Sequence, residues 1–230
     1  MTSETGEKDV VIRFYEEHPF PDNLSLVASS VPLYRKLLGS RKYRSIVVAG
    51  CGTGEELMSL HQLFPEARIT AIEPSNASVA VARERCPWAQ IQNTTIEEFQ
   101  ASECDLVWSA GVLQHTADPF RNLKRLATWA SDGGDVFISV YHHARWDLPQ
   151  PSSESKLSEA QVLDGSAHPR ERTYSWQSFL ALLHAAGLRP HRVWHKLRLP
   201  VPRGRLMCAA YDGLWLYRRI QMLPALCRRV

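Results

Sequence analysis

Three glycines stand at alternate positions after a short apolar run and are followed by two acids. They are Gly50, Gly52 and Gly54 in the stretch VVAGCGTGEE of residues 47–56. Because glycine weakens the helix or strand that contains it, this density indicates that something lies too close to the main chain for side chains. A dinucleotide would need a third glycine where Glu55 stands, and its pyrophosphate would meet negative charge. The loop therefore predicts a ligand without phosphate.

Apolar runs and helical patterns alternate around this loop. The runs predict strands at Ser45–Ala49, Arg68–Ile72, Ala89–Gln92, Cys104–Trp108, Asp135–Tyr141, His191–His195 and Leu206–Ala210. Helical spacing and capping residues predict helices at Glu55–Phe64, Asn76–Arg85, Pro119–Ala130 and Ser175–Ala186. Strands alternating with helices imply a doubly wound, mostly parallel α/β sheet, in which the last two strands pair antiparallel at an edge. Ligands bind such sheets beyond the carboxyl ends of the strands.

The spacing GxGxG followed by acids resembles class I S-adenosylmethionine-dependent methyltransferases. In that family the loop wraps the methionine part of a cofactor that carries a sulfonium. An acid at the end of the second strand holds both ribose hydroxyls, and Glu73 stands there, 19 residues after Gly54 (73 − 54). A carboxylate suits this role because it accepts two hydroxyl hydrogen bonds at once. The resemblance implies a seven-stranded Rossmann-like fold and S-adenosylmethionine as the cofactor.

Further matches extend the resemblance over about 44–141, and loosely over 173–193. Thr95-Ile96-Glu97 lies where the family contacts adenine, residues 104–119 (CDLVWSAGVLQHTADP) are similar to its fourth-strand segment, and a glycine pair precedes the fifth strand. Many members carry an acid where Val48 stands, so one contact to the amino group of the cofactor is left unassigned. The resemblance assigns to the cofactor Gly50, Cys51, Gly52, Thr53, Gly54, Glu73, Pro74, Thr95, Ile96, Ser109, Ala110 and Gly111.

Methyl transfer depends mainly on positioning, so the chemistry does not strictly demand a base. His115, after the fourth strand, has an unperturbed pKa of about 6.5 that suits a general base at neutral pH. The alternative, that it caps a helix or packs on the adenine, stays open. Tyr141 at the end of the fifth strand, Tyr174 beyond it and Tyr15 complete the candidate catalytic residues.

An aromatic segment, RFYEEHPFP, precedes the first strand. We hypothesise that Tyr15, His18 and Phe20 form a lid whose aromatic face meets the sulfonium, a contact worth about 0.5–2 kcal/mol. The alternative is that they fasten a helix onto the sheet. The irregular stretch 142–172 is a second candidate lid. We expect a helical lid at 1–40, a catalytic domain at 41–212 and a basic, apolar extension at 213–230.

No metal site is expected. His142 and His143 end the fifth strand, where alternation should point them to opposite faces. The basic residues of the extension (Arg218, Arg219, Arg228, Arg229) are typical of a solvated face rather than a nucleic-acid patch.

The composition is that of a soluble globular protein of 230 residues with a net charge of +3. That excess is too small to indicate nucleic-acid binding. The five scattered cysteines form no CxxC pair, which favours reduced thiols in the cytoplasm. Neither a secretory signal nor an apolar run of the ~20 residues that span a bilayer is apparent. We expect a cytoplasmic monomer or homodimer with a small-molecule substrate.

Three functions fit these features. The first is an enzyme that methylates a small molecule or a biosynthetic intermediate. The second is a cyclase on the same cofactor, whose amine attacks its own γ-carbon to give azetidine-2-carboxylate and methylthioadenosine. The third is a cofactor-binding scaffold without catalysis.

Overall fold

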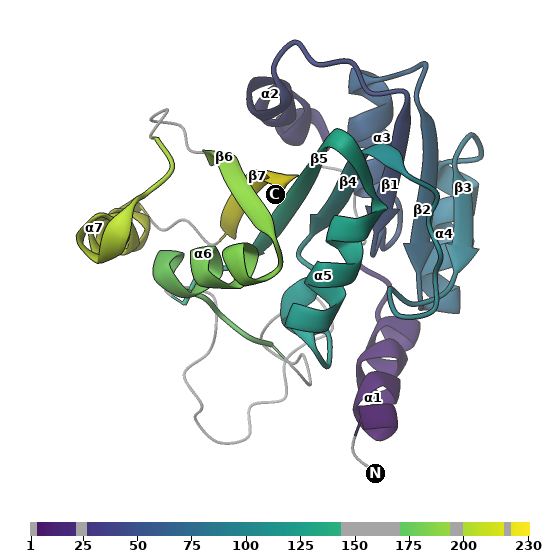
Figure 1. The fold of residues 1–230 in the computed structure, drawn as a ribbon. Coiled ribbons are helices and arrows are strands. Elements are labelled where there is room, and N and C mark those ends of the chain that lie inside the picture. The colour runs from purple at the N-terminus through teal and green to yellow at the C-terminus, as the bar shows by residue number, and fades with distance from the viewer. Residues whose placement is uncertain (1–3, 22–26, 144–170, 194–199, 219–221) are drawn as a thin grey trace.

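A seven-stranded sheet organises the chain, in the order β3-β2-β1-β4-β5-β7-β6 (Figure 1). The computed structural model describes residues 4–21, 27–143, 171–193, 200–218 and 222–230. The strands are β1 Ser45–Ala49, β2 Arg68–Glu73, β3 Gln90–Asn93, β4 Cys104–Ala110, β5 Ala130–Tyr141, β6 Leu188–Val193 and β7 Met222–Arg229. The helices are α1 Glu4–Glu17, α2 Val27–Leu38, α3 Glu55–Leu63, α4 Asn76–Arg85, α5 Pro119–Trp129, α6 Trp176–Ala185 and α7 Gly204–Arg218, with a short 3-10 turn, η1, at Leu113–His115.

Strand order reverses beside β1, which pairs in parallel with β2 on one side and with β4 on the other. β3 and β5 extend the parallel sheet outward. The helix starts follow the predicted chemistry, since Ser75 caps α4 and Asp118 caps α5 by accepting backbone N–H groups. The reversal places the carboxyl ends of β1 and β4 side by side, the usual ligand position in this kind of sheet.

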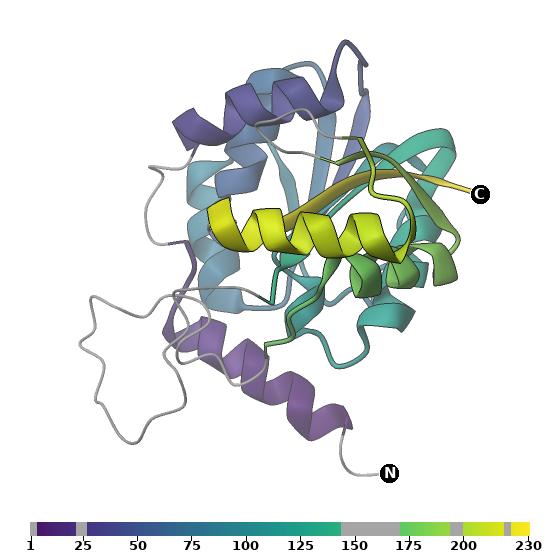
Figure 2. The same ribbon diagram turned by 90° about the vertical axis from the view of Figure 1, so that its left-hand side faces the viewer.

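Two hydrophobic layers cover the sheet, and β1 shows why. Val47 and Ala49 join the core under α5, α6 and α7, whereas Ile46 and Val48 join the core under α2, α3 and α4. A strand buried on both faces reads as the continuous apolar run that marks β1 in the sequence. Figure 2 shows α6 and α7 side by side.

The C-terminal part differs from the sequence prediction. Leu206–Ala210, predicted as a strand, lies within α7, and the strand comes later, at Met222–Arg229. That strand, β7, pairs antiparallel with both β5 and β6, so the predicted extension is part of the sheet. The prediction was wrong because a short apolar run fits a buried helix as well as a strand, and because proline, here Pro224, is rare within sheets. Residues 194 and 195 of the other predicted strand lie outside the described residues.

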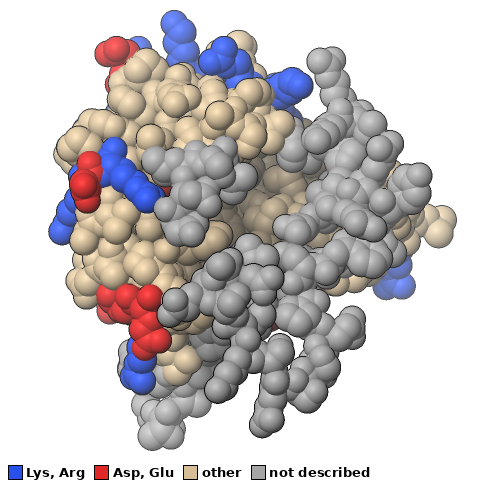
Figure 3. All heavy atoms as spheres, turned by 180° about the vertical axis from the view of Figure 1, so that it is seen from behind, with Lys and Arg blue, Asp and Glu red and all other residues tan. Residues whose placement is uncertain are grey.

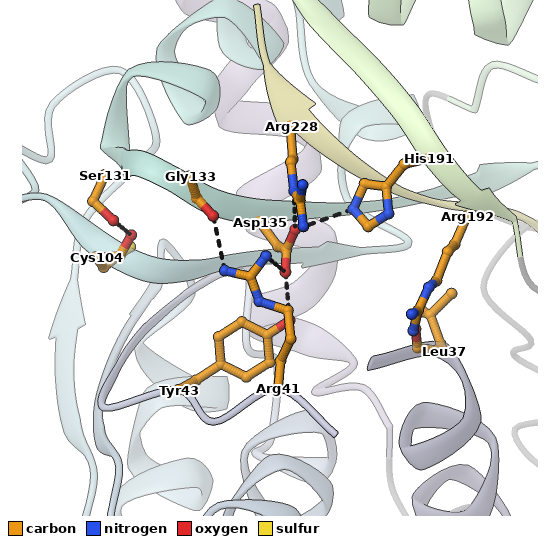
Figure 4. A network of polar contacts seen from close by, with 10 residues as sticks. All are labelled: Leu37, Arg41, Tyr43, Cys104, Ser131, Gly133, Asp135, His191, Arg192 and Arg228. Atoms are coloured by element: carbon orange, nitrogen blue, oxygen red, sulfur yellow. Dashed lines mark hydrogen bonds and ion pairs between the residues drawn. The ribbon is translucent and has the colours of Figure 1, made fainter. Parts of the chain in front are cut away.

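A buried carboxylate on β5 connects the segment before β1 with β6 and β7 (Figure 4). The side chain of Asp135, on β5, has no exposed area and accepts hydrogen bonds from Tyr43 Oη at 2.6 Å and His191 Nε2 at 3.1 Å. Arg41 approaches it at 3.1 Å and Arg228 at 3.5 Å. Burial acts to raise the pKa of Asp135, but the two hydrogen bonds and the Arg41 charge outweigh it and the pKa is lowered.

The charged side chains of the described surface are dispersed. Seen from behind, lysines and arginines form separate groups, with several along the upper edge, and acids gather at the lower left (Figure 3). Within the described part of this face there is no continuous basic stripe of the kind that nucleic acids select. Among the helices described, none combines the length and apolar character needed to cross a bilayer.

Candidate functional site

The glycine loop is a crowded turn made of protein atoms. A Cβ atom on Gly50 would lie 2.5 Å from a Val112 methyl carbon, and one on Gly52 would overlap the Phe20 carbonyl oxygen. Gly54 adopts a φ of 101° and lies against Cys86 of α4, where a Cβ atom would come within 3.0 Å of the sulfur. Part of the reason for three glycines is therefore close packing within the chain.

Glu73 is hydrogen-bonded to this loop. It is buried at the end of β2, where one carboxylate oxygen accepts the Gly52 N–H at 3.0 Å and the other accepts the Ser75 N–H at 3.0 Å. A carboxylate offers about four lone-pair sites, so both oxygens retain acceptor capacity. Loop and acid thus form one unit at the carboxyl edge of β1 and β2.

A cavity of about 380 Å³ opens at this edge. That volume lies in the range of small-ligand sites. The predicted residues that line the cavity are Tyr15, Phe20, Gly50, Cys51, Gly52, Glu73, Pro74, Thr95, Ile96, Ala110, Gly111, His115 and Tyr141. The glycine loop, the acid of β2, the end of β4 and the aromatic segment therefore meet around one space.

Five predicted residues lie outside this lining. Thr53 and Gly54 face α4 and the Phe20-Pro21 corner, where the Thr53 hydroxyl donates to the Pro21 carbonyl and accepts from Arg85. Ser109 is buried, Tyr174 bridges to His142 beyond the end of β5, and the His18 ring packs at a tilt against Phe14. These five residues are not part of the described cavity lining, and their roles stay predictions.

Sequence reasoning assigned no role to several lining residues, namely Val11, Ile12, Pro21, Glu55, Glu56, Ile72, Ser78, Thr94, Val112, Thr116, Ala117 and Met222, whereas Glu97 belongs to the predicted adenine segment. The apolar positions Val11 and Ile12 precede Tyr15 at helical spacing, a signal that was present in the sequence. Met222 belongs to β7, which the sequence did not predict.

Burial raises the pKa of three glutamates that line the cavity. Burial raises the pKa of Glu56 and that of Glu73 to about 7, and it raises the pKa of Glu55 as well. Glu56 accepts hydrogen bonds from Tyr34 Oη at 2.7 Å and Trp108 Nε1 at 3.0 Å. A cationic ligand would favour the ionised forms of these carboxyls.

Three buried polar atoms of lining residues have no hydrogen-bond partner within the described part of the chain. They are Glu55 Oε1, Ser78 Oγ and Thr95 Oγ1. Because an unsatisfied buried polar atom costs about 1–3 kcal/mol, such atoms mark a place where a polar ligand binds. The described lining contains four glutamates and no lysine or arginine. The glutamates are Glu55, Glu56, Glu73 and Glu97.

The aromatic segment docks over this cavity through α1. The Glu16 carboxylate accepts the N–H groups of Asn76 at 2.6 Å and Ala77 at 2.9 Å, at the start of α4. These two hydrogen bonds lower the pKa of Glu16. The Tyr15 carbonyl accepts from Ser75 Oγ at 3.1 Å. Figure 1 shows α1 at the lower end of α4. Of the proposed 1–40 lid, α2 instead packs on α3.

Aromatic rings gather on the other wall. The His115 ring is 5 % exposed, with its centre 6.3 Å from that of Tyr15 and 5.6 Å from that of Tyr141. Gln114 Nε2 lies 3.3 Å from His115 Nε2. Arg172 donates to the carbonyls of Thr116 and Ala117, which fixes the segment after η1. The candidate lid at 144–170 lies outside the described residues.

Comparison with known proteins adds the family. A family described as a methyltransferase domain matches residues 47–138. Residues 47–138 of this chain are therefore similar to a methyltransferase domain. The chain is 33% identical over 124 residues to the trans-aconitate 2-methyltransferase of Deinococcus radiodurans, a match that covers 54% of this chain and 46% of that relative. The chain matches between a quarter and a half of the length of the relatives that head the sequence comparison.

Solved structures agree with the fold of this chain. The Burkholderia thailandensis 1,6-didemethyltoxoflavin-N1-methyltransferase, with bound 1,6-didemethyltoxoflavin and S-adenosylhomocysteine, is 16% identical with a TM-score of 0.64. That match covers 100% of this chain and 92% of the other. The plantazolicin methyltransferase BamL, in complex with SAH, is 14% identical with a TM-score of 0.64 over 98% and 97% of the two chains. The predicted fold class is confirmed.

The similarity to a methyltransferase domain implies S-adenosylmethionine as the cofactor, and the cavity fits it. Its sulfonium and ammonium groups are positively charged, and the described lining carries glutamates but no lysine or arginine. Its ribose hydroxyls match the free acceptor capacity of Glu73, and its polar adenine edge matches the unpaired Thr95 hydroxyl. Val48 is buried and pairs with Trp108 of β4, whose indole donates to Glu56 of α3.

The two histidines after β5 do not diverge as predicted. The ring centres of His142 and His143 lie 4.3 Å apart. The strand ends at Tyr141, so the alternation of side chains no longer applies at His143.

Proposed function

We propose that this protein transfers a methyl group from S-adenosylmethionine to a small acceptor molecule. The observation that carries the proposal is the single cavity in which the glycine loop and Glu73 meet an aromatic wall. Two structural relatives are named as a 1,6-didemethyltoxoflavin-N1-methyltransferase and a plantazolicin methyltransferase. These names support a small acceptor and favour natural-product biosynthesis. We retain a monomer or homodimer as a prediction.

In this mechanism the cofactor, when bound, supplies an electrophilic methyl group on its sulfonium. The loop at 50–52 and Glu73 bind its amino-acid and ribose parts, with Thr95 at the adenine. The rings of Tyr15, His115 and Tyr141 orient the acceptor and exclude water, and positioning of this kind can supply much of the barrier reduction. His115 takes up the acceptor proton where the acceptor needs a base. We infer that α1 and the Phe20-Pro21 corner form the lid.

The charge of the cavity restricts the acceptor. The described lining carries acids without lysine or arginine, and a carboxylate-rich acceptor would need such cations to replace its hydration. We therefore propose a neutral or cationic acceptor with an aromatic or apolar body. A tricarboxylate such as trans-aconitate, named for the sequence relatives, does not suit this wall.

One experiment tests both parts of the proposal. The full chain is incubated with S-adenosylmethionine alone, then with trans-aconitate, and then with panels of neutral and cationic aromatic compounds, and the products are measured by mass spectrometry. We expect S-adenosylhomocysteine to form only with neutral or cationic acceptors. Turnover of trans-aconitate would refute the charge argument. Formation of methylthioadenosine from the cofactor alone would refute methyl transfer in favour of the cyclase, which the comparisons do not favour.

A further inference from the structure

Two histidines and an aspartate converge where β5 ends. His142 and His143 follow Tyr141 directly, and Asp212 comes from α7. One potential ligand atom from each side chain lies within 4.8 Å of the other two. Within the described part of the chain, this is the one group of three such side chains with that geometry. None of the three lines the cofactor cavity, so the cluster needs its own explanation.

The distances suit a small metal ion. His142 Nε2 lies 3.0 Å from Asp212 Oδ1, so any wider separation in the group involves His143. Ligand atoms bound at about 2.0–2.2 Å to a tetrahedral zinc ion are roughly 3.4 Å apart. His143 is exposed, so its side chain has room to adjust toward the other two ligand atoms. The buried pair needs almost no change.

The main chain around the cluster orients these side chains. The Trp176 N–H donates to Asp212 Oδ1 at 2.8 Å, and His143 Nδ1 lies 3.4 Å from the Tyr174 carbonyl oxygen. Metal-binding imidazoles commonly donate their second ring N–H to a backbone carbonyl, and metal-binding carboxylates accept a further hydrogen bond. Both kinds of outer contact are present here.

We propose that His142, His143 and Asp212 bind one zinc-class divalent cation at the carboxyl end of β5. Two imidazoles and a carboxylate are ligands that zinc accepts, and three protein ligands leave a fourth position for water. His142 has no exposed area whereas Asp212 is 18% exposed, so the open position faces solvent. The proposal does not rest on the proposed function.

The bound cation would join the end of β5 to α7, which Figure 2 shows beside α6. The hydrogen bond from the Trp176 N–H to Asp212 connects the start of α6 to the same site. Tyr141 immediately precedes the ligands and lines the cavity. Metal binding would thus hold the Tyr141 end of the cavity wall in place.

The experiment uses the full chain after treatment with a chelator. Calorimetry with Zn²⁺ and visible absorption with Co²⁺ measure stoichiometry and coordination. We expect one ion per chain, with the intense visible bands of four- or five-coordinate Co²⁺. His143→Ala alters an exposed residue, and Asp212→Asn retains an oxygen for the Trp176 N–H, so neither should unfold the chain. Each should weaken Zn²⁺ binding at least tenfold.

His184→Ala is the matched control, because His184 is an exposed histidine on α6 outside the cluster. It should leave Zn²⁺ affinity and the Co²⁺ spectrum unchanged. The proposal is overturned by the absence of stoichiometric binding, or by equal binding in the wild type and in both cluster variants. The second result would mean that the ion binds adventitiously elsewhere, and that His142 and Asp212 form only a buried hydrogen bond between β5 and α7.

Discussion

Replacing Asp135 with asparagine tests how the carboxylate network holds the sheet together. The amide keeps one acceptor oxygen but loses the charge that Tyr43 and His191 contact at 2.6 and 3.1 Å. Hydrogen bonds to charged groups contribute about 1.5–3 kcal/mol each, and breaking a buried charged pair costs about 3–5 kcal/mol. We therefore expect Asp135→Asn to lower the free energy of unfolding by about 3–5 kcal/mol. The contacts of Arg41 and Arg228 add little to this free energy because both arginines are partly exposed.

Thermal unfolding followed by circular dichroism measures this loss. At about 2–4 °C per kcal/mol for a chain of this size, the midpoint should fall by roughly 6–20 °C at pH 7. Because the pKa of Asp135 is lowered on folding, its stabilisation is present above the unfolded pKa of about 3.9 and is lost as the pH falls further. The gap between wild type and variant should therefore narrow below about pH 4.

Asp132→Asn is the matched control for this measurement. Asp132 lies on the same strand, but its side chain is fully exposed and only 3.9 Å from Arg229 at its nearest. Exposed pairs contribute about 0–1 kcal/mol. Equal midpoints for Asp135→Asn and Asp132→Asn would refute the argument that burial makes this network important.

Three further predictions concern the cofactor site. Glu73→Gln should weaken S-adenosylhomocysteine binding by about 10–100-fold in calorimetry, because a charged acceptor of hydroxyl groups is lost. Glu66→Gln, at an exposed acid, should bind normally, and equal affinities would exclude the ribose role. Because burial raises the pKa of Glu56 and Glu73 to about 7, S-adenosylmethionine affinity should fall up to about tenfold per carboxyl from pH 7 to pH 6, and a flat profile would contradict this. Glu16→Ala should speed hydrogen exchange in α1 about fivefold, through loss of about 1 kcal/mol at the α4 cap, whereas Glu17→Ala should not. Equal exchange in the two variants would show that Glu16 does not hold the lid.

The parallel half of the fold could be predicted because its signals are local. Ser75, Asp118 and the apolar run of β1 each determine structure through near neighbours in the sequence. The antiparallel half could not, since β7 is specified by pairing with β5 and β6 rather than by its own pattern. Pro224 argues against a strand when only local rules apply.

The same division holds for the candidate site. The loop glycines and Glu73 are recognisable from spacing, and they do line one cavity. The raised pKa values of Glu55 and Glu56 depend on burial by distant segments, so no pattern in the sequence contains them. The resemblance assigned Thr53 to the ligand, and no pattern in the sequence indicated that its hydroxyl donates to the Pro21 carbonyl.

The position of β7 has a consequence for how the protein is made. β5 keeps one open edge until residues 222–229 emerge from the ribosome, long after the glycine loop and Glu73 have been synthesised. Open edges of sheets recruit other chains, so the nascent protein passes through a stage prone to aggregation. Met222, which completes the cavity wall, arrives with the same strand. A chain truncated before that strand would thus expose the edge of β5 and would lack Met222 in the cavity wall.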